Sequence, residues 1–284
     1  MGTGSKDAAH EKLDRLLAIL REMDGALCAL SGGVDSSFLL KIAVEAMGGN
    51  LLAVTASSAL HHRREIEDAA RYAISLDVPH LIIETDELAR EVFAANTTDR
   101  CYHCKKDLFG RLAAIARERG IKNVIEGSNR DDEADFRPGR MALAELGVRS
   151  PLRDAGLSKH EIRSLAREMG VPAHARPSQA CLASRFPYGT RITHERVSMV
   201  ARAEEILLGH GLTQLRVRFC GDTARIECLP AEMHLFLTRE ISGDVVRRFK
   251  ELGFLYVALD LEGYRTGSLN EVLHQIGLPA GVKV

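Results

Sequence analysis

Residues 29–37, with the sequence ALSGGVDSS, constrain the fold of this chain more than any other stretch. An apolar run over residues 26–30 stops at Gly32 and Gly33, and apolar residues then recur at helical spacing from Phe38 onward. The stretch therefore predicts a strand, a tight glycine turn and the N-terminus of a helix. The first backbone N–H groups of a helix have no carbonyl partner within it, and together with the helix dipole they attract an anion.

The side chains of this turn indicate a phosphate site that also holds a cation. Glycine has no Cβ, so a phosphate can approach the main chain closely. Asp35 would repel that phosphate unless a cation lay between them, which indicates Mg²⁺. The predicted ATP and pyrophosphate site comprises Ser31, Gly32, Gly33, Asp35, Ser36 and Ser37, with Asp35 as the magnesium ligand.

Strands and helices alternate over the first part of the chain. Strands are predicted at residues 51–55, 80–84 and 123–127, and helices at residues 9–23, 65–76, 108–119 and 159–169. This order is typical of an α/β fold with a parallel sheet. Ligands of such folds bind at the carboxyl ends of the strands, so Thr55 and Gly127 are assigned to the nucleotide site.

The pattern changes after the turn-rich residues 186–190, with the sequence FPYGT. Beyond them we predict a helix at 193–209, strands at 215–219 and 224–227, helical structure at 231–252 and a strand at 254–259. The sequence thus predicts a larger nucleotide-binding domain at residues 1–189. A smaller α+β domain follows at residues 190–284, expected to serve substrate binding and oligomerisation.

Three of the six cysteines have a spacing that indicates chemistry. Cys101 and Cys104 form a CxxC pair, and Cys181 lies in the segment PSQACLASR. Three thiolates suit a [4Fe–4S] cluster that keeps one iron open for an outside ligand. A zinc site with His103 as fourth ligand, or thiols without a metal, are the alternatives that spacing leaves open.

Basic residues follow these cysteines, and we assign them to substrate binding. Arg216 and Arg218 alternate along one predicted strand, so both side chains point to the same face and could clamp one phosphate. A solvated strand face is the alternative. The predicted substrate-binding residues are Lys105, Lys106, Ser184, Arg185, Glu204, Arg216 and Arg218.

Composition excludes some classes of function. The formal net charge of −1 gives no basic excess that would favour nucleic acid. No apolar run approaches the roughly 20 residues of a membrane span. We therefore expect a cytoplasmic protein without a nucleic-acid or membrane partner, in which the cysteines are reduced, metal-bound or catalytic.

The glycine turn resembles the SGGxDS loop of the ATP-pyrophosphatase (PP-loop) superfamily, whose members split ATP between the α and β phosphates. A wider set of segments resembles the LarE family, ATP-dependent sulfur-insertion enzymes of nickel-pincer nucleotide cofactor synthesis. These segments are SGGVDSS at residue 31, CYHCK at 101, EGSNRDDEADFRPG at 126, SPLRDAGLSKHEIR at 150, PSQACLASRFPYG at 177 and VALDLEGYRTGSLNE at 257.

This resemblance implies a substrate and a mechanism. The substrate would be pyridinium-3,5-biscarboxylic acid mononucleotide, whose carboxylates are adenylated and become thiocarboxylates. Arg216 and Arg218 would grip its phosphate, and the protein would form a homo-oligomer. Some family members sacrifice the sulfur of one cysteine, whereas others carry sulfide on a three-cysteine [4Fe–4S] cluster, and Cys101, Cys104 and Cys181 resemble the latter type.

Two other PP-loop activities are the alternatives. A tRNA thiolase shares the ATP chemistry but needs a surface for tRNA, which the net charge does not indicate. An ammonia-dependent amide synthetase would not require three cysteines.

Overall fold

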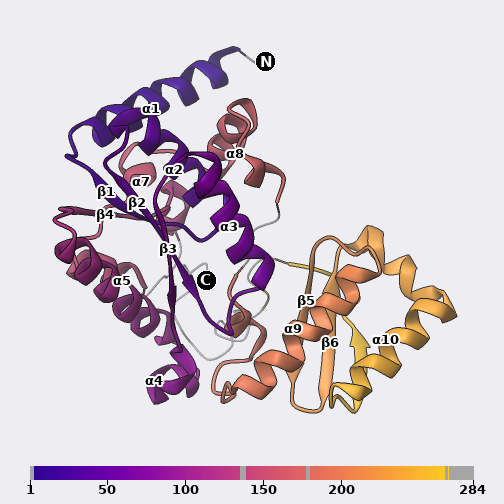
Figure 1. The fold of residues 1–284 in the computed structure, drawn as a ribbon. Helices are drawn as coiled ribbons and strands as arrows, with labels where there is room; N and C mark the ends of the chain where they lie inside the picture. Colours follow the sequence, from indigo (N-terminus) through magenta and orange to yellow (C-terminus); the bar gives the residue numbers. More distant parts are fainter. Residues whose placement is uncertain (1–2, 135–138, 177–179, 266–267, 269–284) are drawn as a thin grey trace. The chain divides into compact units, whose positions relative to one another are not determined.

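The computed structural model describes residues 3–134, 139–176, 180–265 and 268 (Figure 1). By its contacts the chain forms two compact units, Met1–Thr85 with Cys101–Gln179, and Asp86–Arg100 with Ala180–Val284. The domain boundary predicted between residues 189 and 190 stays a prediction. The contacts group residues 86–100 and 180–189 with the second unit.

The first unit contains a four-stranded parallel sheet, which confirms the predicted α/β class. Its strands are β1 (Ala26–Ala29), β2 (Leu51–Ser57), β3 (His80–Glu84) and β4 (Asn123–Ile125), in the order β3-β2-β1-β4. Its helices are α1 (Thr3–Arg21), α2 (Val34–Met47), α3 (Arg63–Ser75), α5 (Arg100–Glu118), α6 (Gly139–Glu145), α7 (Pro151–Asp154) and α8 (Lys159–Glu168).

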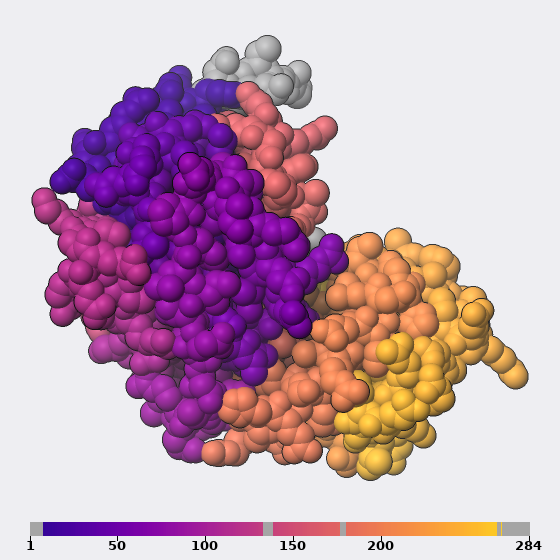
Figure 2. Space-filling model, viewed as in Figure 1, coloured from indigo at the N-terminus to yellow at the C-terminus, as the bar shows by residue number. Residues whose placement is uncertain are grey.

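Both faces of this sheet are covered, and the alternation of side chains along β1 divides the core. Cys28 packs on one face with residues of α1, α2, α3 and α8. Leu27 packs on the other face with Phe109 and Leu112 of α5. The helix α3 forms part of the outer surface on the side drawn in Figures 1 and 2. All four β1 residues are therefore apolar, as parallel strands buried on both faces require.

The second unit is α+β, as predicted. Its strands β5 (Leu215–Cys220) and β6 (Thr223–Cys228) pair antiparallel, and β7 (Tyr256–Leu259) pairs parallel to β6. Helices α9 (His194–Gly209) and α10 (Arg239–Glu251) accompany the sheet, and the short α4 (Glu91–Ala94) also belongs to this unit. The helical segment predicted at 231–252 divides into a 3₁₀ turn, Pro230–Leu237, and α10.

No helix within the described ranges combines the length and the apolar character needed to cross a bilayer.

Candidate functional site

The glycine turn between β1 and α2 has the geometry that the sequence predicts. Gly32 has a φ of +77°, and a Cβ there would lie 2.8 Å from the carbonyl oxygen of Glu65. Gly127, just after β4, packs on the first turn of α2, where a Cβ would lie 2.9 Å from the backbone nitrogen of Ser36. Both positions require glycine because any side chain would collide with main chain. The carboxyl ends of β1 and β4 thus meet at the N-terminus of α2.

The serine hydroxyls of this turn hold its shape. Ser36 Oγ donates to the carbonyl oxygen of Gly33 at 3.2 Å and lies 3.0 Å from Ser31 Oγ. Ser36 Oγ also accepts from the backbone nitrogen of Ser31 at 3.2 Å. Ser37 is buried in the first turn of α2. The backbone N–H groups of this turn are the donors that the helix itself cannot use.

Asp35 has one carboxylate oxygen in contact with other side chains and one without a partner. Its Oδ2 accepts hydrogen bonds from Lys159 Nζ and from Asn129 Nδ2. Its Oδ1 is buried and lacks a hydrogen-bond partner among the described residues. Burial raises the pKa of this carboxyl and Asp132 adds to the rise, while Lys159 opposes it. A buried carboxylate oxygen with an unused lone pair suits Mg²⁺, which takes oxygen ligands.

Lys159 was not predicted to belong to the site. It opens α8 directly after Ser158, whose hydroxyl forms a capping box with Glu161. The backbone nitrogen of Lys159 donates to Asp131 Oδ2 at 2.8 Å, which ties the acidic segment after β4 to the start of this helix. The capping box marks the helix start in the sequence, but nothing local indicates that Lys159 reaches Asp35. Asp131 belongs to an acidic run at residues 131–135, of which Asp135 lies outside the described residues.

Glu126 is a second residue that sequence reasoning missed. It is buried after β4 and accepts hydrogen bonds from Ser128 Oγ at 2.8 Å and Ser150 Oγ at 2.5 Å. Lys105 Nζ lies 3.9 Å from its Oε2. A buried carboxylate requires such donors, so Glu126 holds three segments of this region together.

Two predicted site residues are engaged by other groups in the first unit. Lys106 donates to Tyr102 and Glu145, and these hydrogen bonds raise its pKa to about 12. Thr55 Oγ1 donates to the carbonyl oxygen of Leu30 at 2.7 Å and lies 2.8 Å from His80 Nε2. Their roles in substrate and nucleotide binding stay predictions.

Cys101 and Cys104 lie in the first turns of α5, which begins eight residues before the predicted start at residue 108. A spacing of three places both side chains on one side of the helix. Cys101 is exposed and Cys104 is partly buried. Cys181 is exposed in the second unit and directly precedes the 3₁₀ turn Leu182–Arg185. Within the described residues, no three histidine, cysteine, aspartate or glutamate side chains are grouped to hold a metal ion.

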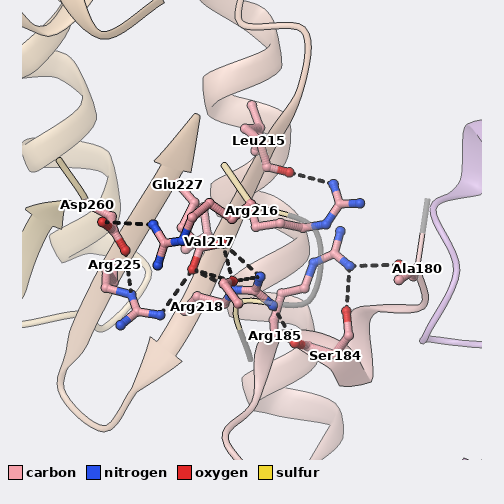
Figure 3. A network of polar contacts seen from close by, with 12 residues as sticks. Ala180, Ser184, Arg185, Leu215, Arg216, Val217, Arg218, Arg225, Glu227 and Asp260 are labelled. Atoms are coloured by element: carbon pink, nitrogen blue, oxygen red, sulfur yellow. Dashed lines mark hydrogen bonds and ion pairs between the residues drawn. The ribbon is translucent and has the colours of Figure 1, made fainter. Parts of the chain in front are cut away.

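The second unit contains a buried arginine cluster (Figure 3). Arg185 forms a bidentate pair with Glu204, at 2.8 and 2.9 Å. Arg218 forms a second with Glu227, at 3.0 and 2.7 Å, and also donates to the carbonyl oxygen of Ser184. Glu227 was not predicted, although it lies on β6 beside this pair of arginines. The cluster therefore joins β5 to the segment that follows Cys181.

Arg216 lies in the same cluster with different partners. Its Nη1 donates to the carbonyl oxygen of Leu215 at 2.6 Å, and its guanidinium lies 5.1 Å from the ring centre of Tyr264. Burial lowers the pKa of Arg216, and the neighbouring charge of Arg185 lowers it further. Figure 3 shows these two guanidinium groups next to each other. An anion bound next to Arg216 would raise its pKa again and so oppose the effects of burial and of Arg185.

The remaining cysteines divide by burial. Cys28 and Cys228 are buried, and burial raises the pKa of Cys28 to about 12. Cys220 is exposed at the end of β5. A thiol with a raised pKa is a poor nucleophile and metal ligand, so Cys28 serves as a core residue, as predicted.

Known proteins resemble this chain over nearly its whole length. A family model described as NAD synthase matches residues 14–125. An uncharacterised protein of Synechocystis sp. is 43% identical over 264 residues, covering 93% of this chain and 98% of the relative. The pyridinium-3,5-bisthiocarboxylic acid mononucleotide synthase of Lactiplantibacillus plantarum is 38% identical over 259 residues, covering 91% of this chain and 93% of the relative.

A more distant relative, an uncharacterised protein of Methanocaldococcus jannaschii, is 28% identical over 243 residues, covering 84% of this chain and 90% of the relative. The match with the Lactiplantibacillus synthase covers 91% of this chain, so it extends through both units. The chain therefore belongs to the LarE family, that of the pyridinium-3,5-bisthiocarboxylic acid mononucleotide synthases.

Proposed function

We propose that this protein is an ATP-dependent sulfur transferase that acts on pyridinium-3,5-biscarboxylic acid mononucleotide. It transfers AMP to a carboxylate of this nucleotide, releases pyrophosphate and inserts sulfur to give a thiocarboxylate. The observation that carries the proposal is the glycine turn at the N-terminus of α2, in a chain 38% identical to a synthase of the bisthiocarboxylic acid product. A carboxylate is a poor electrophile, and adenylation supplies the leaving group that it lacks.

In the proposed reaction, the turn at residues 31–37 binds the phosphates of ATP. The backbone N–H groups at the start of α2 donate to phosphate oxygens. Asp35 holds Mg²⁺, which is supported by its buried Oδ1 without a partner. When bound, Mg²⁺ offsets the charge of the phosphates and orients them for cleavage. Lys159 contributes a second positive charge at the same carboxylate.

In the second unit, the arginine cluster binds the phosphate of the substrate nucleotide. Arg185 pairs with Glu204 and Arg218 with Glu227, and Arg216 donates to the carbonyl oxygen of Leu215 and lies near the ring of Tyr264. Glu204 and Glu227 hold the first two in place, and Ser184 lies beside them. Arg216 and Arg218 donate hydrogen bonds to this phosphate, and Lys105 and Lys106 serve the carboxylates of the substrate.

Cys101, Cys104 and Cys181 are the residues that would hold a [4Fe–4S] cluster. The chemistry of three thiols supports this proposal, since thiolates are the usual ligands of iron–sulfur clusters and Cys101 and Cys104 share one side of α5. Such a cluster would supply the sulfide for transfer. The protein acts in the cytoplasm as a homo-oligomer, where a reducing environment keeps these thiols available.

Analysis of the nucleotide products tests the function directly. Incubation of the anaerobic protein with Mg-ATP and the pyridinium dicarboxylate nucleotide should give AMP and pyrophosphate. The variant Asp35→Ala should slow pyrophosphate release about 10²-fold or more, the scale of losing an electrostatic stabiliser. Asp24→Ala removes an exposed aspartate of the same unit and serves as the matched control. ADP and inorganic phosphate as products would refute the assignment.

A further inference from the structure

Asn96 is a buried residue that the proposed chemistry has not used. It is fully buried and has a φ of +57°, a left-handed conformation that asparagine tolerates better than most residues. Its Nδ2 donates to the carbonyl oxygens of Phe186, Pro187 and Thr190, at 3.3, 2.8 and 3.1 Å. The main-chain carbonyl oxygen of Asn96 accepts a hydrogen bond from the backbone nitrogen of Gly189 at 2.9 Å. The segment at 86–100 is thereby bound to residues 186–190 within the second unit.

The same asparagine holds Arg100. The Nη1 of Arg100 donates to Asn96 Oδ1, and its guanidinium lies 5.3 Å from the ring centre of Tyr188. Arg100 is 3% exposed, and its Nε is buried without a hydrogen-bond partner among the described residues. No carboxylate in the described part of the chain pairs with this guanidinium. Arginine stays charged when buried, and a buried charge without a counter-ion is costly.

The positions of Asn96 and Arg100 in the sequence connect them to the cysteines. Arg100 directly precedes Cys101, and residues 186–190 follow Cys181 by one short turn. On the Cys181 side, Arg185 Nη1 donates to the carbonyl oxygens of Ala180 and Cys181, at 2.7 and 3.3 Å. A continuous series of hydrogen bonds and peptide bonds therefore runs from the main chain of Cys181 to that of Cys101.

We infer that Asn96 and Arg100 are positioning residues for the three-cysteine centre. Asn96 fixes the chain that enters Cys101 to the chain that leaves Cys181. The buried positive charge of Arg100 offsets part of the negative charge that thiolates and sulfide bring. This inference rests on the proposed cluster, and it assigns to the segment at 86–100 a role separate from ATP binding.

The test uses full-length protein reconstituted anaerobically with ferrous iron and sulfide. Iron per chain, resistance of that iron to a chelator and the midpoint potential are measured for the wild type and for Asn96→Ala, Arg100→Gln and Arg100→Lys. Asn123→Ala is the matched control, because Asn123 donates from Nδ2 to the carbonyl oxygen of Gly25 inside the first unit. Binding of Mg-ATP is measured in every variant as a check on folding.

We expect Asn96→Ala to lower the affinity for cluster iron about 10- to 100-fold, the usual effect of losing an outer partner of a metal ligand. Arg100→Gln should shift the midpoint potential to more negative values, because reduction adds negative charge that the arginine no longer offsets. Arg100→Lys keeps the charge and should stay near the wild-type potential. Mg-ATP binding should be unchanged throughout.

Three results would decide against the inference in different ways. Iron binding in Asn96→Ala equal to that of wild type and Asn123→Ala would overturn the positioning role. An unchanged potential in Arg100→Gln would overturn the electrostatic role, and this result stands even where Asn96→Ala does not fold. A wild-type protein that binds no iron would overturn the cluster itself, while leaving the ATP chemistry to its own test.

Discussion

Asp35 and Lys159 lie 124 positions apart in the sequence, yet they meet at the proposed magnesium site. Removing the ammonium group with Lys159→Met should slow pyrophosphate release about 10²-fold, because a fixed charge near the phosphates is lost. Lys159→Arg should retain part of the activity. Lys41→Met, which removes a lysine paired with Glu45 on α2, is the control and should have little effect. The rates are measured by following pyrophosphate at saturating Mg²⁺, and equal rates for all four proteins would show that Lys159 has no part in the reaction.

The two arginines on β5 should differ when replaced. Arg216→Ala should weaken binding of the substrate nucleotide by about 1.5–3 kcal/mol, the value of a charge-assisted hydrogen bond, and should leave ATP affinity unchanged. Arg218→Ala should in addition lower the free energy of unfolding by about 1–3 kcal/mol, because the buried Glu227 would keep only Arg225 and Ser268 as partners. Calorimetric titration of each ligand and thermal unfolding separate the two effects. A parallel loss of ATP affinity in Arg216→Ala would place this arginine in the ATP site instead.

At the residue scale, the sequence predicted groups with a local pattern. The glycines and Asp35 stand within a few positions of one another, so the turn could be recognised from spacing. Lys159, Glu126, Glu227 and Asn96 owe their roles to partners far away in the sequence. Their neighbours in the sequence give no hint of those partners.

The helix α8 carries Lys159, and its capping box predicts how its stability depends on pH. Burial raises the pKa of Glu161, but hydrogen bonds from Lys12 and Ser158 outweigh it and lower the pKa to about 2. A carboxylate with a lowered pKa stabilises the folded state above its ordinary pKa near 4.5 and loses this contribution as the pH falls towards 2.

Glu161→Gln should therefore lower the free energy of unfolding by about 1 kcal/mol near neutral pH, the usual value of a helix cap. The difference from wild type should vanish towards pH 2. Glu168→Gln, at the exposed end of α8, is the control and should show little effect. Denaturant unfolding at several pH values provides the measurement, and a difference that persists unchanged in acid would contradict the assignment.

Elements with a clear apolar period were predictable. The strand at 80–84 was predicted with its observed bounds, and the predicted bounds of α8 and α9 differ from the observed ones by one residue. The first turns of α5 were missed because the sequence RCYHCKKD shows no apolar face. The CxxC pair therefore lies on a helix that was predicted to begin only after it.

At the scale of the whole molecule, the grouping of residues 86–100 with the second unit could not be read from the sequence. This segment stands between β3 and α5 of the first unit, and its attachment depends on one buried asparagine and a few backbone hydrogen bonds. The composition changes little over residues 86–100, so a domain boundary predicted from composition does not separate this segment from the first unit. The fold class, in contrast, followed from the alternation of strands and helices and is confirmed.

The catalytic role of the three cysteines is tested by counting the thiocarboxylate groups formed per protein chain under anaerobic conditions, with excess Mg-ATP, substrate and sulfide. Sulfide carried on a cluster should give more than one thiocarboxylate per chain, one AMP for each, and an unchanged mass of the protein. Replacing Cys101, Cys104 or Cys181 by alanine should abolish product while ATP cleavage persists. A yield that stops at one thiocarboxylate per chain, with a loss of about 34 Da at Cys181 as its thiolate sulfur departs, would show instead that Cys181 is consumed as the sulfur source.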